Sequence, residues 1–251
     1  MLGDIFVLSI LYRIMRSYGI DPLKTYHAIK NTPRFLKTYL KFKRNDSFYP
    51  ILTDYDSLAG SIRGHYFHQD LWAARKIYRH QPTEHVDIGS RIDGFVAHLL
   101  TFMPVTVIDV RHLNSDVKNL KFYQSDATKL KLKSNSIESI SSLHAIEHFG
   151  LGRYGDPINE NACYEAMLEL SRVLKINGRL YFSVPIGIER VEFNAHRIFD
   201  PSTILNYFDH LELIEFSAVD DNGLYHENAD PYYFSDCNFA CGLFEFTKAK
   251  L

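Results

Sequence analysis

The chain has little of several features that would mark particular classes of protein. Its 251 residues include three cysteines, whose spacing fits neither a disulfide framework nor a paired CxxC metal site. Reduced thiols in a cytosolic protein are therefore expected. The formal charge of −2 gives no overall attraction to nucleic acid. The apolar run at residues 5–12 is far shorter than the ~20 residues that span a bilayer, and it lacks the basic segment of a signal peptide, so a packed helix is expected.

Composition along the chain predicts a helical extension followed by one larger domain. Apolar residues make up 46% of the chain and charged residues 23%, which permits a packed core. Pro50, Gly60 and Gly64 indicate a connector, so residues 1–64 are separated from residues 65–251. The extension has a basic excess, which is either a solvated helix face or a peripheral contact with anionic lipid or substrate phosphates at the inner face of the membrane. The basic residues are Lys24, Lys30, Arg34, Lys37, Lys41, Lys43 and Arg44.

From residue 68 onwards, strand-like and helix-like segments alternate. Apolar positions in residues 161–174 follow the helical period, and Asn177-Gly178 is predicted to end that helix. The alternation predicts an α/β fold with a doubly wound seven-stranded sheet, mostly parallel, and a terminal antiparallel strand pair. The predicted strands are residues 86–88, 105–110, 120–123, 137–143, 179–185, 211–219 and 239–248, and the main predicted helices are 68–78, 94–101 and 161–174.

Polar or glycine residues follow each of the first four predicted strands. The first strand runs into a turn that contains Gly89, where a ligand can lie against bare backbone. Asp109 ends the second strand, Asp126 follows the third, and His144 follows the fourth. Any one of these could be a simple cap or turn residue. Because ligands of doubly wound sheets bind at the carboxyl ends of the strands, the ordered series predicts a nucleotide site.

These residues resemble those of the class I S-adenosylmethionine-dependent methyltransferases. The resemblance rests on Asp87-x-Gly89, Asp109, Asp126-Ala127 and RVLKINGRLYFSVP (172–185), and it covers roughly residues 84–248. It implies S-adenosylmethionine as cofactor, with Asp87 and Gly89 beside the methionine part, Asp109 at the ribose and Asp126 at the adenine. The cofactor-binding residues expected in this way are Asp87, Gly89, Ser90, Gly94, Asp109, Val110, Asp126, Ala127, His144 and Gln69.

The glycine loop departs from the family pattern, because Arg91 and Asp93 stand where later glycines are usual. A narrower resemblance involves HYFHQDLWAARKI (65–77), EHFGLGRYGDP (147–157) and FNAHRIF (193–199). These segments are similar to a methyltransferase-like family catalogued as a domain of unknown function, whose members are often encoded among surface-polysaccharide genes. This likeness suggests O-methylation of a carbohydrate or glycolipid intermediate.

Methyl transfer to a hydroxyl calls for a base that removes its proton. His148, just beyond the fourth predicted strand, His196 and Asp156 are the predicted catalytic residues. Each also has a structural interpretation, as a helix cap, a loop hydrogen bond or a turn. The predicted substrate-binding residues are Arg153, Tyr154, Asn194 and Arg197, with the arginines suited to an anionic sugar or phosphate. The segment around Tyr66, His68 and Gln69 could cover the cofactor or simply pack.

The string His144-Ala-Ile-Glu147-His148 also matches the inverted zinc-peptidase motif H-x-x-E-H. That chemistry needs both histidines on one helical face, whereas residues 137–143 are predicted to be a strand and Phe149-Gly150 would break a helix. A divalent ion on Glu147 and His148 is a weaker variant, because ubiquinone-pathway O-methyltransferases have a similar Glu-His pair. We expect no metal.

Two further alternatives stay open. A nicotinamide-dependent oxidoreductase would use Asp109, although the G-x-G-x-x-G fingerprint is absent. A non-catalytic methyltransferase-like module is the other. The expected partners are a small-molecule or glycan acceptor and, as options, a membrane surface and a second copy of the chain.

Overall fold

The computed structural model describes residues 2–42, 48–60 and 62–250. The chain divides into two compact units, residues 1–61 and residues 62–251. Lys43 and Arg44, which belong to the predicted basic group, lie outside the described residues. Every helix in the described parts is too short or too polar to span a bilayer.

The first unit contains two helices, α1 (Leu2–Ser17) and α2 (Pro22–Phe42). The predicted helix over the N-terminal apolar run is therefore confirmed, whereas its packing on the body of the protein stays a prediction. After α2 the chain folds back on that helix. The side-chain amide of Asn31 in α2 donates to the carbonyl of Leu52 and to Asp56 Oδ2 in the returning segment, both at 3.1 Å. The guanidinium of Arg34 lies 4.5 Å from the ring centroid of Tyr55. These contacts hold the connector within the first unit.

The second unit is built on an eight-stranded sheet with the order β3-β2-β1-β4-β5-β10-β8-β9. Strands β1 to β5 pair in parallel, whereas β10 is antiparallel to both β5 and β8. The strand order reverses between β1 and β4, where doubly wound sheets bind their ligands. The strands are β1 (His85–Ile88), β2 (Val105–Asp109), β3 (Leu120–Gln124), β4 (Ile137–Leu143), β5 (Leu174–Ile186), β8 (Glu212–Val219), β9 (Tyr225–His226) and β10 (Ala240–Thr247).

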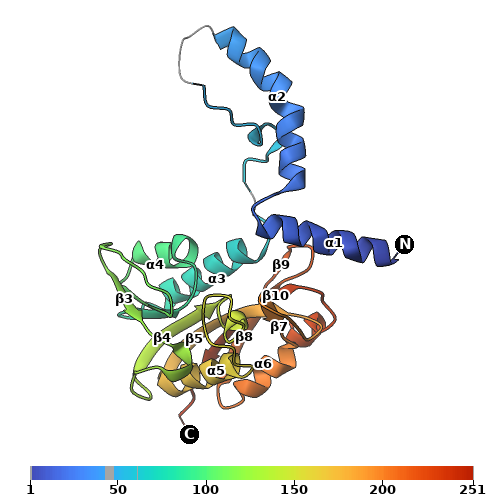
Figure 1. Ribbon diagram of the computed structural model, residues 1–251. Coiled ribbons are helices and arrows are strands. Elements are labelled where there is room, and N and C mark those ends of the chain that lie inside the picture. Colours follow the sequence, from blue (N-terminus) through green and yellow to red (C-terminus); the bar gives the residue numbers. More distant parts are fainter. Residues whose placement is uncertain (1, 43–47, 61, 251) are drawn as a thin grey trace. The chain divides into compact units, whose positions relative to one another are not determined.

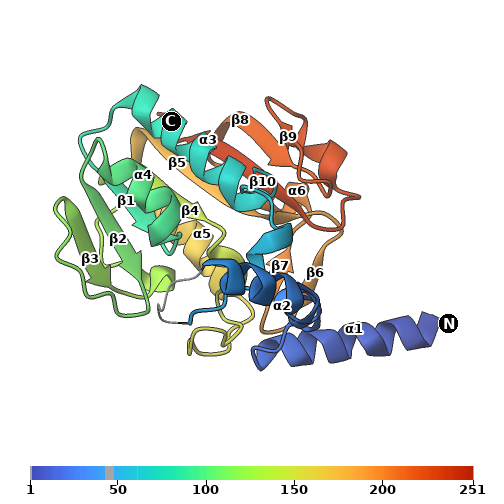
Figure 2. The same cartoon turned by 90° about the horizontal axis from the view of Figure 1, so that it is seen from above.

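Helices cover both faces of this sheet, and each face has its own hydrophobic cluster. Helices α3 (His65–His80) and α4 (Ala97–Leu100) lie on one side, and α5 (Ala162–Val173) and α6 (Pro201–Tyr207) lie on the other (Figure 1). Seen from above, α3 runs across β5 and β10 (Figure 2). Successive residues of β5 serve opposite faces, because Tyr181 belongs to the cluster under α3 and Phe182 to the cluster over α5.

The predicted fold class is confirmed, and the strand count and the predicted end of α5 were wrong, whereas the helix predicted at residues 94–101 is present as helical turns from Ile92 to Leu100. The sheet has eight strands rather than seven, because the two-residue β9 pairs with the end of β8. Asn177-Gly178 does not end α5, which stops at Val173; Leu174 turns to extended backbone and starts β5, and Asn177 lies within that strand with φ of 62°. The predicted helix at residues 94–101 begins with a wide turn, Ile92–Val96, before α4.

A short hairpin, absent from the predicted elements, follows β5. It consists of β6 (Arg190–Glu192) and β7 (His196–Ile198), paired in antiparallel fashion. Asn194 lies at its turn with φ of 63°. The hairpin brings His196 and Arg197 back to the carboxyl end of the sheet, because Ile186 bridges to Phe199 beside it.

Candidate active site

A cavity of about 250 Å³ opens at the carboxyl ends of β1, β2 and β3 and beside the segment that follows β4. We call it the cofactor pocket. Nine of the predicted site residues line it: Gly89, Asp109, Val110, Asp126, Ala127, His144, His148, Tyr154 and Asp156. Residues at the carboxyl ends of four strands therefore lie together in one pocket, as the general rule for ligand sites in doubly wound sheets predicts.

Gly89 forms the floor of the cofactor pocket in a conformation that suits glycine. Its φ is 70°, and a Cβ built there would lie 3.1 Å from Cβ of Ala145. Asp87 lies beneath this floor and is fully buried. Its carboxylate accepts hydrogen bonds from the backbone N–H of Ser90 at 3.0 Å and from the hydroxyls of Ser90 and Ser141 at 2.5 and 2.6 Å. Asp87 and Ser90 thus shape the loop from below and do not line the pocket.

Burial raises the pKa of Asp87 to about 6, and the hydrogen bonds from Ser141 and Ser90 only partly oppose that rise. A cation above the loop would favour the ionised carboxylate. The loop is therefore suited to a positively charged ligand group.

Asp109 is paired with Arg111, a residue that the sequence reasoning missed. Arg111 donates from Nε to Asp109 Oδ1 at 3.0 Å and from Nη2 to Oδ2 at 2.6 Å, and its backbone N–H also donates to Oδ1 at 2.8 Å. A carboxylate accepts about four hydrogen bonds. Ribose hydroxyls can therefore reach Asp109 only beside Arg111 or after it turns away. The guanidinium also lies 4.4 Å from the ring centroid of Tyr154, on the opposite wall.

Asp126 caps the short turn that follows β3. Its Oδ1 accepts from both the backbone N–H and the hydroxyl of Thr128, each at 2.8 Å. The bonds fix the carboxylate at the pocket wall, next to Ala127. Asp126 can thus be a structural cap and still present its second oxygen to a ligand.

His148 lies where the cofactor pocket meets a second pocket, lined by His65, Tyr66, His144, Glu147, His148, Arg153, Pro185, His196 and Phe239, which we call the histidine pocket. Its Nδ1 lies 2.6 Å from the carbonyl of Ala195. Because a carbonyl only accepts, Nδ1 carries the proton and Nε2 of the neutral ring presents a lone pair. Burial lowers the pKa of His148, which favours that neutral form.

Glu147 lies between two histidines. Its Oε1 is 2.7 Å from His144 Nδ1 and 3.7 Å from His148 Nε2, and the residue is 1% exposed. Burial opposes ionisation of Glu147, but its neighbour His144 lowers the pKa of the carboxyl. Glu147 Oε2 is buried and has no hydrogen-bond partner among the described residues. The zinc-peptidase arrangement is not present, because His144 follows a strand with φ of 48° and His148 ends a single short turn, so the two rings do not share a helical face.

Asp156 stabilises the loop that follows β4 rather than acting as a catalytic base. Its Oδ2 accepts from the backbone N–H of Gly150 at 2.7 Å and of Gly152 at 3.4 Å, and Oδ1 accepts from Tyr154 at 3.1 Å. Both carboxylate oxygens of Asp156 are therefore engaged by the backbone of this loop.

Arg197 is also structural. It is 4% exposed, and its guanidinium donates to the carbonyls of Phe149 at 2.6 Å, Glu147 at 3.4 Å and Glu160 at 3.2 Å. It fastens the hairpin to the segment after β4 and offers no group to a substrate. Arg153 differs, because it lines the histidine pocket and donates to the carbonyl of Ala195 at 2.9 Å.

Three other predicted residues lie away from both pockets. Gln69 is buried in α3 and bonds to Asp70 and Ser183. Gly94 makes room for a carboxylate, since a Cβ there would lie 2.3 Å from Asp70 Oδ2. Asn194 is exposed at the hairpin turn. His196 does reach the histidine pocket, where burial lowers its pKa and Glu192 Oε2 lies 3.5 Å from Nε2.

Comparisons with known proteins agree with this architecture. A family model described as a Caenorhabditis protein of unknown function, DUF268, matches residues 106–225, just under half of the chain. No curated protein matches. The solved structure of the YcgJ protein from Bacillus subtilis is similar at 14% identity and a TM-score of 0.52, covering 73% of this chain and 99% of that one. The N-methyltransferase NodS from Bradyrhizobium japonicum, in complex with S-adenosyl-L-homocysteine, is similar at 11% identity and a TM-score of 0.51, covering 86% and 98%.

The fold is that of the class I S-adenosylmethionine-dependent methyltransferases. The [4+2]-cyclase SpnF is also similar, at 13% identity and a TM-score of 0.52, covering 72% of this chain and 81% of that one. One fold thus accommodates more than one chemistry, so the reaction has to be argued from the site.

Proposed function

We propose that this protein is an S-adenosylmethionine-dependent methyltransferase that methylates an oxygen of a carbohydrate or glycolipid intermediate. The observation that carries the proposal is the cofactor pocket at the point where the strand order reverses. There Gly89 leaves room for a ligand, and the carboxylates of Asp109 and Asp126 line the walls. Carboxylates at these two strand ends suit ribose hydroxyls and an adenine amino group. The ionisable Asp87 below the loop suits a sulfonium cation above it.

The histidine pocket supports an acceptor site beside the cofactor, since His144 and His148 line both pockets. When bound, S-adenosylmethionine would supply an electrophilic methyl group. An acceptor hydroxyl in the histidine pocket would lose its proton to His148 Nε2 while its oxygen forms the new bond to the methyl carbon, and the methyl–sulfur bond would break with its electron pair left on the sulfur. Arg153 adds a cation that suits an anionic sugar or phosphate. The enclosed arrangement would help align the reactants and exclude water.

Two rival functions make different predictions. A nicotinamide-dependent oxidoreductase would place its pyrophosphate on a G-x-G-x-x-G turn, and residues 87–95 contain no such sequence. A non-catalytic module would bind the cofactor without turnover. His148 lines both pockets and donates from Nδ1 to the carbonyl of Ala195, which leaves Nε2 to accept a proton and favours catalysis.

Contact with anionic lipid through the first unit, and formation of a homodimer, belong to the same proposal. The basic side chains of α2 that favour a lipid surface are exposed: Lys24, Lys30, Arg34, Lys37 and Lys41. A lipid-linked glycan would bring the acceptor to such a surface.

Calorimetry with S-adenosylmethionine and with NADH tests the cofactor assignment. We expect binding of the first and none of the second. Asp109→Ala should weaken S-adenosylmethionine binding roughly 10- to 100-fold, as expected when a hydrogen bond to a charged group is lost. Asp116→Ala, in the exposed loop after β2, is the matched control and should bind as the unchanged chain does. Binding of NADH alone, or unchanged affinity in Asp109→Ala, would overturn the assignment.

A further inference from the structure

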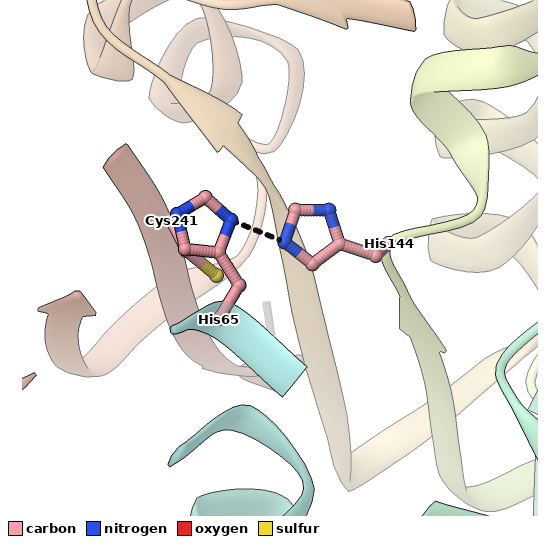
Figure 3. A group of neighbouring side chains, drawn as sticks. All are labelled: His65, His144 and Cys241. Atoms are coloured by element: carbon pink, nitrogen blue, oxygen red, sulfur yellow. Dashed lines mark hydrogen bonds between the residues drawn. The ribbon is translucent and has the colours of Figure 1, made fainter. Parts of the chain in front are cut away.

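Three potential metal ligands that are far apart in the sequence meet at the wall of the histidine pocket (Figure 3). His65 is the first residue of α3, His144 directly follows β4, and Cys241 lies at the start of β10. One ligand atom from each lies within 4.8 Å of the other two. His144 and Cys241 are buried and His65 is half-buried. Each is fixed by a helix or strand, as a preorganised site requires.

The hydrogen bonds around the two imidazoles leave a lone pair in the middle of this cluster. His144 Nδ1 is 2.7 Å from Glu147, whose carboxylate can only accept, so Nδ1 carries a proton and Nε2 is the atom that offers a lone pair once the ring is neutral. That Nε2 lies 3.1 Å from His65 Nδ1. The His65 ring is also held by a hydrogen bond to the backbone of Phe239. Histidines that bind metals are commonly oriented by a carboxylate or a backbone carbonyl in this manner.

The distances suit a small tetrahedral ion. Two nitrogens bound to one zinc ion at the usual bond length lie roughly 3.3 Å apart, close to the separation of the two ring nitrogens. The Cys241 sulfur makes a weak contact of 3.8 Å with the carbonyl of Gly242, and its other neighbour is the ring of His144, a member of the same cluster. Two imidazole nitrogens and a sulfur form a soft donor set that prefers zinc over magnesium or calcium.

We propose that His65, His144 and Cys241 bind a divalent transition-metal ion, preferably Zn²⁺, and that Glu147 orients His144 toward it. The fourth position of a tetrahedral ion would remain open to the histidine pocket, as in catalytic zinc sites. Glu147 lines the same pocket, and within residues 2–42, 48–60 and 62–250 its buried Oε2 has no partner, so it can accept from a water or hydroxyl there.

The rival occupant of the cluster is a proton shared by the two rings. Burial alone would lower the pKa of His144, but Cys241 and Glu147 raise it well above the usual value. Burial lowers the pKa of His65 to about 4. One imidazolium that bonds to the neutral ring and to Cys241 would satisfy all three side chains without an ion. Metal binding and a shared proton therefore differ in whether the cluster takes up an ion with a bond to the sulfur.

Metal binding itself does not depend on the proposed methyl transfer. Only its consequence does: an ion in this wall would polarise an acceptor oxygen bound beside His148. The two proposals fail separately, because the metal measurement uses no S-adenosylmethionine and the calorimetry above is carried out on metal-free chain.

The test uses the full-length chain, without an affinity tag, after treatment with a strong chelator. Dialysis against Zn²⁺ followed by plasma mass spectrometry should give one zinc per chain. Titration with Co²⁺ should produce a thiolate-to-cobalt charge-transfer band in the near ultraviolet and visible bands of a tetrahedral ion. Failure to bind either ion stoichiometrically would overturn the proposal in favour of the shared proton.

Variants assign the ligands. Cys241→Ser should abolish the charge-transfer band, whereas Cys163→Ser and Cys237→Ser should keep it. Glu147→Gln should keep the band and weaken Zn²⁺ binding roughly 10- to 100-fold, as loss of an orienting partner does. If Cys241→Ser does not fold, His65→Ala provides a second test, because His65 is only half-buried. Its Zn²⁺ affinity should fall, whereas that of His68→Ala, on the same helix, should not. An unchanged band in Cys241→Ser, or unchanged Zn²⁺ affinity in His65→Ala, would overturn the proposal.

Discussion

At the scale of single residues, the direction of one lone pair separates His148 from the other candidate bases. Asp156 is engaged by three backbone N–H groups, and His196 lies beside Glu192 in the hairpin. His148 has its proton fixed on Nδ1 by the carbonyl of Ala195, which leaves Nε2 as the acceptor. Only His148 of these three lines both pockets. It is therefore the best-placed base for an acceptor hydroxyl.

Replacing His148 by alanine should lower turnover by at least ~10²-fold while leaving cofactor affinity intact, since general base catalysis typically contributes that much. Turnover is measured with a matched glycan acceptor, and affinity by calorimetry. His112→Ala, in the exposed loop after β2, serves as the control. A His148→Ala enzyme with normal turnover, beside an impaired His196→Ala enzyme, would transfer the role to His196.

The pH profile of kcat/KM tests the same assignment. Because burial lowers the pKa of His148 below its ordinary value of 6.5, the ring is neutral, and active as a base, throughout the range above that lowered pKa. The rate should therefore stay constant near neutral pH and fall only on acidification. His148→Ala should remove that acid limb, whereas a limb retained in the variant would contradict the assignment.

Part of the site could be predicted from sequence because the carboxyl ends of the parallel strands lie at the same edge of a doubly wound sheet. Asp109, Asp126, His144 and His148 followed predicted strands, and all four line the cofactor pocket. Whether a side chain is buried could not be predicted in the same way. Arg197 looks like a substrate ligand in sequence, but its guanidinium bonds to three buried carbonyls that come together only in the fold.

At the scale of elements, the apolar pattern predicted the long strands and missed the short ones. The hairpin strands β6 and β7 have three residues each; β6 is exposed or half-buried throughout and β7 ends in two buried residues, so neither is long enough to show a strand-like alternation. The cluster of His65, His144 and Cys241 was missed for a related reason. Its members come from a helix start, a strand end and an antiparallel strand, and only the strand pairing brings β10 beside β5.

An ion cluster fixes α3 to the sheet. Lys76 Nζ lies 2.5 Å from Glu215 Oε2 in β8 and 2.9 Å from Glu245 Oε2 in β10, and the side chain of Glu245 is 2% exposed. Removing one partner of a buried pair leaves the other charge incompletely compensated. Arg179 Nη1 lies 3.6 Å and His80 Nε2 3.2 Å from Glu245 Oε1, and these neighbours compensate only part of the loss.

Lys76→Met should therefore lower the free energy of unfolding by roughly 3 kcal/mol, at the lower end of the range for a broken buried pair. The double variant Lys76→Met/Glu245→Gln should recover part of the loss, because the uncompensated charge is gone. Lys121→Met, at an exposed position of β3, is the control and should change stability by less than about 0.5 kcal/mol. Urea denaturation followed by circular dichroism measures all three, and equal losses in Lys76→Met and Lys121→Met would exclude the cluster as a structural tie.

At the scale of the whole molecule, the hydrophobic core belongs to the second unit. The buried hydrophobic side chains of the described residues all lie between Trp72 and Phe246. The cofactor pocket is lined by residues from Ile88 to Glu165. The interactions of Asn31 and Arg34 described above stay within the first unit. Folding and cofactor binding are thus expected to need the second unit alone.

A chain that begins at Ile62 should therefore unfold cooperatively and bind S-adenosylmethionine as the full-length chain does. If the basic side chains of α2 bind a lipid surface, the truncated chain should no longer cosediment with vesicles that contain anionic lipid. High salt should abolish the cosedimentation of the full-length chain, because salt screens electrostatic attraction. Urea denaturation, calorimetry and sedimentation give the three readouts. Loss of cofactor binding would assign the first unit to the active site, and vesicle binding equal in both chains would remove the lipid role of α2.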